Sequence, residues 1–284
     1  MLTQDGQRLV FRYDDHTYWV EPWGPNAFHV RATRLPEMPS GDYAALAPTP
    51  PDASSNSAIR LPESTAGEAT ITNGSIRAEI SHRGKITMYN AQSGKKLLEE
   101  YARHRLDLHD PKCSALMVQA RELRGIQGTS DFNTTLRLES VDPDERLYGM
   151  GQYQHPYLNL KGADIELAQR NSQASVPFAV SPLGYGFLWN NPAIGRAVLG
   201  RNVMSFESFS AKSIDYWIVA GDEPREIVEA YANVTGKVPM MPEYGLGFWQ
   251  CKLRYPTQEE LLGVAGEYKS RKIPLDVIVI DFFH

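Results

Sequence analysis

Residues 245–284 read GLGFWQCKLRYPTQEELLGVAGEYKSRKIPLDVIVIDFFH, and this stretch decides the fold class of the last part of the chain. The apolar run GLGFWQC (245–251) predicts a short strand, and DVIVID (276–281) predicts a second strand that is buried on both faces of a parallel sheet. Between them, Thr257-Gln-Glu-Glu260 matches a capping box with an apolar stripe behind it, which predicts a helix. We therefore expect one β-α-β unit.

The chain upstream has a different pattern, in which short alternating apolar and polar runs recur after Gly, Asn and Pro from residue 8 to about residue 219. Runs of this kind favour an antiparallel β-sandwich. The clearest runs are RLVFRY (8–13), TYWVEPW (17–23), AFHVRAT (27–33), SIRAEIS (75–81), KITMYN (85–90), TTLRLES (134–140), GYGFLWN (184–190), VMSFESF (203–209) and DYWIVAG (215–221). Trp189, Trp217 and Phe187 are expected to lie in the core of this sandwich.

Two segments interrupt or end the strand pattern. Residues 35–64 are rich in Pro, Ser and Ala and predict a loop insertion. Near residue 222 the period becomes helical, with Pro224 suited to the first turn and Gly236 to the position just past the helix end. We expect a sandwich domain over 1–235, and over 236–284 the start of a second domain.

Bulk composition excludes several classes of protein. The net charge of −5 and the absence of Lys/Arg clusters argue against a nucleic-acid partner. Cys113 and Cys251 are too few for a disulfide framework or a sulfur-based zinc site, and a reducing compartment is the default. With no apolar signal region in the first residues and no run of ~18 apolar residues, we expect a cytoplasmic protein without a membrane partner.

Four sequence blocks stand out in the latter half of the chain: RLYGMGQYQHPYLNLKG (146–162), RNSQASVPFAVSPLGYGFLWNNP (170–192), DYWIVAGDEPREIVEAYANVTGKVPMMPEYGLGFWQCKLRY (215–255) and IPLDVIVIDFFH (273–284). These blocks resemble glycoside hydrolase family 31, the family of retaining α-glucosidases and α-xylosidases. The motifs FWQCKLRY (248–255) and IDFFH (280–284) are most similar to its α-xylosidase-like members.

The resemblance implies a galactose-mutarotase-like β-sandwich, followed by a (β/α)8 TIM barrel of which this chain holds the first β-α-β unit. Such a barrel needs ~250 residues, so most of it is expected beyond the end of this sequence. The nucleophile and acid/base Asp residues of the family are likewise expected downstream of His284. The implied substrate is an oligosaccharide or small α-glycoside, with no cofactor or metal, because two carboxylates suffice for this chemistry. The family also leaves room for a homo-oligomer of the full enzyme.

The resemblance carries over part of a sugar-binding pocket. Asp281 matches the family's Asp at the end of the second barrel strand, which hydrogen-bonds sugar hydroxyls; the alternative is a carboxylate that caps a helix or pairs with an Arg. Phe282 and His284 follow on the same loop and either line the sugar site or pack the loop. Lys252, like Arg254, either faces the pocket or is a solvated loop charge.

In the sandwich, Gly149-Met-Gly151-Gln152 resembles a turn that the family directs towards the catalytic mouth. Gln152 and His155 are therefore candidate substrate-binding residues, with Tyr153 and Tyr157 beside them. A metal-ligand role for His155 is disfavoured because no Cys, His or carboxylate stands at ligand spacing. Cys251, within an apolar strand, is expected to be a buried small hydrophobe rather than a nucleophile.

Three functions remain open. The first is the front part of a retaining α-glycoside hydrolase that cleaves terminal α-xylosides or α-glucosides in carbohydrate metabolism, and that is inactive as this chain alone. The second is a non-catalytic sandwich module for carbohydrate binding or assembly. The third is one half of a split enzyme, whose activity would return on mixing with a downstream polypeptide.

Overall fold

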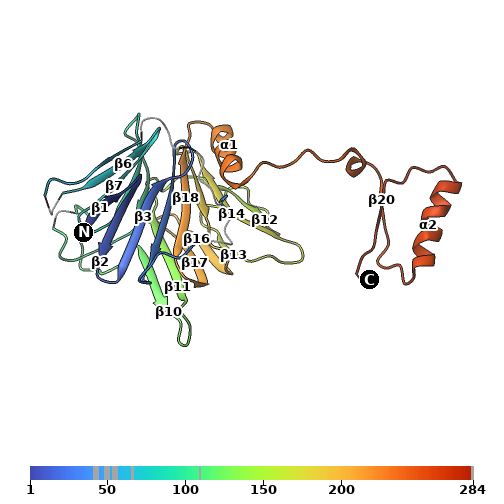
Figure 1. The fold of residues 1–284 in the computed structure, drawn as a ribbon, viewed down its shortest axis with the longest axis horizontal. Coiled ribbons are helices and arrows are strands. Elements are labelled where there is room, and N and C mark those ends of the chain that lie inside the picture. Colours follow the sequence, from blue (N-terminus) through green and yellow to red (C-terminus); the bar gives the residue numbers. More distant parts are fainter. Residues whose placement is uncertain (41–44, 48–51, 53–56, 65–66, 109, 283–284) are drawn as a thin grey trace. The chain divides into compact units, whose positions relative to one another are not determined.

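The computed structural model describes residues 1–40, 45–47, 52, 57–64, 67–108 and 110–282, and within them the chain forms two compact units. The first unit is Met1–Gly236 and the second is Lys237–His284 (Figure 1). Each unit has its own sheet structure and is described by itself.

The described residues of the first unit form two antiparallel sheets. One has eight strands in the order β1-β2-β3-β4-β18-β15-β14-β12. Their bounds are β1 Leu2–Asp5, β2 Arg8–Tyr13, β3 His16–Pro22, β4 Ala27–Thr33, β12 Tyr148–Gln152, β14 Ala174–Ser181, β15 Tyr185–Trp189 and β18 Ile214–Ala220.

The second sheet has the order β13-β16-β17-β11-β9-β8-β7-β6-β5, with β10 paired to β11. Its strands are β5 Ala58–Arg60, β6 Ala69–Asn73, β7 Ile76–Ile80, β8 Ile86–Asn90, β9 Lys96–Glu100, β10 Arg121–Gly125, β11 Phe132–Glu139, β13 Asp164–Leu167, β16 Gly195–Leu199 and β17 Val203–Ala211. Figure 1 shows both sheets together with helix α1 (Pro224–Thr235) at one end of them.

A continuous apolar core joins the two sheets. Residues of both sheets alternate inward, as in β7 and β8, where every second side chain is fully buried. The Phe187 ring on β15 lies 4.7 Å from the Phe206 ring on β17, and Trp189 donates its indole N–H to Ser208 Oγ at 3.1 Å. The predicted sandwich is confirmed, and Trp189 and Phe187 lie in its core as predicted. Trp217 is also buried, but in a separate apolar cluster beneath α1.

Helix α1 packs on the outer face of the eight-stranded sheet, in an apolar cluster separate from the core between the sheets. Glu223 and Glu226 form the reciprocal capping box, Pro224 occupies the first turn, and Gly236 follows the last residue with φ of 107°. Ile227 and Val234 are its buried residues, and they pack with Phe178, Leu188, Trp217 and Val219 of the eight-stranded sheet. The helix therefore begins and ends where its sequence signals predict.

The second unit is small and open. It contains η1 (Glu243–Leu246), a 3-10 turn, then β19 (Trp249–Cys251), α2 (Gln258–Ser270) and β20 (Val277–Val279). β19 and β20 pair in parallel, Trp249 opposite Val277 and Cys251 opposite Val279. Thr257 caps α2 by accepting the Glu260 backbone N–H at 3.2 Å. The predicted β-α-β unit is confirmed.

The structure corrects four local predictions. The first strand of the second unit is shorter than GLGFWQC (245–251), because the first residues of that run belong to a 3-10 turn. DVIVID (276–281) is only partly buried, since the described residues of this unit cover little of β20. Within residues 35–64, β5 pairs with β6, so this segment is not all loop, although part of it lies outside the described residues. Residues 149–152 belong to an edge strand rather than a turn.

Candidate functional site

Asp281 lies at the carboxyl end of the parallel pair, two residues after β20 ends at Val279. Its Oδ1 accepts the backbone N–H of Phe282 at 2.8 Å, while its Oδ2 lies 3.6 Å from the Cys251 thiol at the end of β19. Side chains that follow neighbouring parallel strands meet at one edge of the sheet, where ligands bind in this class of fold. The backbone contact fixes one carboxylate oxygen, and in the described part of this loop Oδ2 faces a weak donor, the thiol.

Cys251 is exposed in the second unit, which corrects the expectation of a buried small hydrophobe. The pKa of its thiol is raised, first by the loss of hydration and then by the hydrogen bond and charge of Asp281. The thiol form therefore dominates at neutral pH, and it donates to the carboxylate. A reactive cysteine requires the opposite shift, so the environment agrees with the expectation that Cys251 is not a nucleophile.

Lys252 and Arg254, on the loop after β19, point to different partners. Lys252 forms an ion pair with Glu260 in the first turn of α2, and its ammonium lies 5.7 Å from the ring centre of Tyr255. The Arg254 guanidinium lies 5.9 Å from the ring centre of Phe282. Lys252 is thus held by the helix, whereas Arg254 and Phe282 bring the two loops together beside Asp281.

Phe282 has a φ of 65° and is largely exposed. A left-handed backbone is uncommon for a bulky residue and is found where surrounding structure or function demands it. It presents the aromatic ring at the same sheet edge as Asp281. His284, the other candidate on this loop, lies outside the described residues.

In the first unit, the GMGQ segment forms the edge strand β12, which pairs with β14 across a bulge between Gly149 and Gly151. Three consecutive residues have positive φ: Gly149 at 102°, Met150 at 66° and Gly151 at 96°. A Cβ on Gly151 would stand 2.0 Å from the Ala174 carbonyl oxygen, so the close strand approach needs glycine. The bulge buries Met150 and leaves Gln152 exposed.

An aromatic group follows β12. The rings of Tyr153 and His155 stack at 5.8 Å with planes 4° apart, and His155 lies 5.7 Å from Tyr157. Tyr153 donates its hydroxyl to Ser175 Oγ at 2.8 Å, which fixes the first ring to β14. His155 Nδ1 accepts the Tyr157 backbone N–H at 3.3 Å. Gln152 and His155 are therefore near neighbours on one edge of the sandwich.

A buried ion pair between Glu145 and Lys161, not predicted from the sequence, brackets this segment. Lys161 Nζ lies 2.8 Å from Glu145 Oε2, and Tyr185 and Ser181 each donate to Glu145 Oε1 at 2.6 Å. Burial, with the Glu145 carboxylate next to it, raises the pKa of Tyr185 well above its usual value. The pair fixes both ends of the segment that carries Gln152 and His155. The sequence does not predict this pair, because single Glu and Lys residues are usually exposed to solvent.

Two features of the described residues bear on alternative functions. They contain no group of three or more His, Cys, Asp or Glu side chains arranged to hold a metal ion. In the same part of the chain, no helix combines the length and apolar character needed to span a membrane.

Residues 238–284, which hold the β-α-β unit, match the model of the glycosyl hydrolases family 31 TIM-barrel domain. A family 31 glucosidase of Pseudescherichia vulneris, itself uncharacterised, is 45% identical over 291 residues, covering 100% of this chain. The chain belongs to glycosyl hydrolase family 31. The predicted resemblance is thereby confirmed.

Solved family 31 structures confirm the fold class. A family 31 α-xylosidase from a soil metagenome, solved in complex with xylose, superposes with a TM-score of 0.89 at 49% identity, covering 100% of this chain and 42% of that one. A xylosidase from Aspergillus niger has a TM-score of 0.77 at 26% identity, covering 96% and 38%. An α-xylosidase of Saccharolobus solfataricus is 37% identical over 171 residues, 57% of this chain and 23% of its own. The chain spans about half the length, or less, of these family 31 relatives.

Proposed function

We propose that this family 31 chain is part of a retaining α-glycoside hydrolase that cleaves terminal α-xylosides or α-glucosides, with Asp281 as a residue that binds the sugar. The single observation that carries the proposal is the position of Asp281 at the carboxyl end of β20, within the segment that matches the barrel model. Two similar proteins described as α-xylosidases, one with bound xylose, favour xylose over glucose as the sugar.

The geometry of Asp281 suits this role. Its Oδ1 is anchored by the Phe282 N–H, so the carboxylate has a defined direction before a ligand arrives. An anchored carboxylate accepts from two neighbouring hydroxyls and thereby fixes the orientation of a sugar ring. Phe282 adds an exposed aromatic face, and Arg254 stands over that ring.

The chemical step needs more than this carboxylate. Retaining hydrolysis uses a nucleophile and an acid/base whose carboxyls lie ~5–5.5 Å apart. In the described loops that follow β19 and β20, Asp281 is the single carboxylate. We propose that the catalytic pair lies outside these residues and that this chain by itself binds sugar without cleaving it. A carbohydrate-binding or assembly module, or one half of a split enzyme, is the alternative.

The test is Asp281→Asn in the natural polypeptide that carries these residues, assayed on 4-nitrophenyl α-xyloside and α-glucoside. Loss of two hydrogen bonds to a charged group should lower kcat/KM by about 100-fold or more. Glu259→Gln, which alters an exposed glutamate in the first turn of α2, is the matched control and should leave kcat/KM unchanged. An Asp281→Asn enzyme within two-fold of the parent would contradict the role.

If the natural polypeptide hydrolyses neither glycoside, two further measurements separate the alternatives. Saturable D-xylose binding that Asp281→Asn weakens would support a binding module. Activity that returns only on mixing with a second polypeptide would identify a split enzyme.

A further inference from the structure

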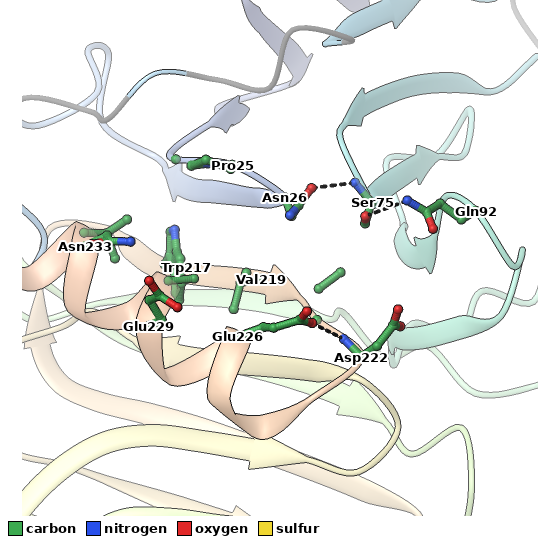
Figure 2. Close-up of a pocket in the computed structure, with 15 residues that line it drawn as sticks. Pro25, Asn26, Ser75, Gln92, Trp217, Val219, Asp222, Glu226, Glu229 and Asn233 are labelled. Carbon is green, nitrogen blue, oxygen red and sulfur yellow. Dashed lines mark hydrogen bonds between the residues drawn. The ribbon is translucent and has the colours of Figure 1, made fainter.

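A cavity of about 400 Å³ lies in the first unit, between helix α1 and three turns of the sandwich (Figure 2). The end of β18 and one side of α1 form one wall. The turn after β3 and the turns that precede β7 and β9 form the other, with Pro25, Asn26, Ser75 and Gln92. Its volume falls within the ~300–1,000 Å³ range of small-molecule sites.

The lining combines an apolar inner wall with a polar rim. Trp217 and Val219 reach the cavity from β18, and Ala230 and Val234 from α1. The polar rim consists of Asp222, Glu226, Glu229 and Asn233 on one side and Asn26, Ser75 and Gln92 on the other. Lys and Arg are absent from these lining residues, so the chemistry disfavours phosphate and other anions.

Some polar groups of the rim form hydrogen bonds within the protein, and others are available to a ligand. Glu226 Oε2 accepts the Asp222 N–H at 3.0 Å, and Asn26 Oδ1 accepts the Ser75 N–H at 2.8 Å. Gln92 donates once, to Ser75 Oγ at 3.1 Å, which leaves its carbonyl oxygen. Among the described residues, the side chains of Glu229 and Asn233 have no hydrogen bond or ion pair, and both border the cavity in Figure 2.

We propose that this cavity is a saccharide-binding site, separate from the barrel, for one or two neutral sugar rings. Sugar hydroxyls both donate and accept, and the rim offers carboxylate acceptors together with amides that do both. A cationic amine only donates and would leave the amide donors unused. A metal ion fits less well, because the carboxylates here are not grouped as ligands. The apolar inner wall matches the C–H face of a sugar ring.

This inference does not depend on the role of Asp281, which belongs to the second unit. The two sites can therefore be tested in one titration of the whole chain. Side-chain amides report each of them: Asn233 and Gln92 for the cavity, and Gln250, on β19, for the barrel end.

The experiment follows these amides and the Trp217 indole N–H by NMR while D-xylose or maltose is added. We expect saturable shifts of Asn233, Gln92 and Trp217. Glu229→Gln, an exposed mid-helix change, should weaken the fitted affinity by about ten-fold. Asn233→Trp, which places a large ring in the cavity mouth, should abolish the shifts. Glu259→Gln on α2 is the matched control and should leave them unchanged.

Three results would overturn the proposal: no shift with either sugar, shifts only with calcium chloride or putrescine, or sugar-dependent shifts at Gln250 without any at Asn233. The last result would still support sugar binding by the barrel end. Conversely, shifts at Asn233 that persist in Asp281→Asn would support the cavity whether or not the proposed barrel role holds.

Discussion

The two units contain similar apolar sequences but bury them to very different extents. In the sandwich, Trp189 and Trp217 are 0–1% exposed, whereas Trp249 on β19 is 49% exposed and Ile280, after β20, is 54% exposed. Tyr255 is the one buried residue among the described residues of the second unit. An apolar run therefore becomes core only where a second layer covers it.

The layer that covers the strands differs between the two units. Each sandwich strand faces the opposite sheet, so Phe187 and Trp189 on one sheet meet Phe206 on the other. The parallel pair β19–β20 has α2 as its partner, with Phe248 5.9 Å from Tyr268 and a hydrogen bond of 2.7 Å from Tyr268 to Gln250. One helix packed on two short strands stabilises much less than two full layers.

The largest expected difference is between two tryptophans. Trp189→Ala removes a fully buried ring and should lower the free energy of unfolding by about 3–5 kcal/mol. Trp249→Ala removes a half-exposed ring from the other unit and should change the same transition by less than about 1 kcal/mol. Urea unfolding followed by circular dichroism measures both. Equal losses of unfolding free energy in the two variants would contradict the difference in burial between the two units.

A smaller difference should separate two glycines. At Gly151 a Cβ would meet the Ala174 carbonyl oxygen at 2.0 Å, and the backbone of a paired strand cannot easily move. Gly151→Ala should cost about 1–3 kcal/mol, for the positive φ and the overlap together.

Gly247→Ala, in the second unit, is its counterpart. Its Cβ would meet the Asp276 side chain, which can rotate away at the loss of the hydrogen bond to Phe248 N. Its effect on the melting temperature of the sandwich should be negligible. A Gly151→Ala protein as stable as Gly247→Ala would mean that the β12 bulge is not as tight as described.

The smallest expected difference in stability is between two ion-paired glutamates, and it depends on pH below 4.5. Burial raises the pKa of Glu99, but hydrogen bonds from Lys85, Lys96 and Lys112 outweigh it and lower the pKa to about 2. A lowered folded-state pKa means that the stabilisation is present above the usual value of 4.5 and is lost as pH falls towards 2.

Glu99→Gln should therefore be less stable than the parent at neutral pH, and the gap should close between pH 4.5 and 2. Denaturant midpoints measured across that range give the result. Glu260→Gln removes the exposed pair with Lys252 in the second unit and should cost no more than about 1 kcal/mol. If the stability difference between Glu99→Gln and the parent does not change with pH, the lowered pKa of Glu99 is refuted.

Alternating strands were the most predictable part of the fold. The predicted run at 75–81 contains β7 and the run at 85–90 contains β8, and in both strands every second residue is buried, as the alternating sequence predicts. β10 (RELRG) has no alternation, and β13 (DIEL) alternates over only four residues before it pairs with β16, so neither strand was predictable from its own sequence. The two glycines of β12 predict a turn, but in the structure their positive φ angles form a bulge within an edge strand.

The part of the candidate site that follows a strand was predictable from the sequence, whereas the contacts made by tertiary packing were not. The position of Asp281 after a parallel strand was predictable, and its role in sugar binding stays a prediction that rests on the rule that ligands bind there. The contact between Cys251 and Asp281 depends on strand register, and the Glu145–Lys161 pair depends on tertiary packing. The cavity proposed to bind sugar is formed by β18, α1 and three distant turns, so no local sequence pattern predicts it.

Hydrogen exchange of the whole chain, read by mass spectrometry, tests the central claim that a closed core exists in Met1–Gly236 and not in Lys237–His284. Amides of β4, β15 and β18 should exchange slowly, at rates set by global unfolding of the sandwich. Amides of α2 and β20 should exchange orders of magnitude faster. Equal protection in the two units would contradict the account.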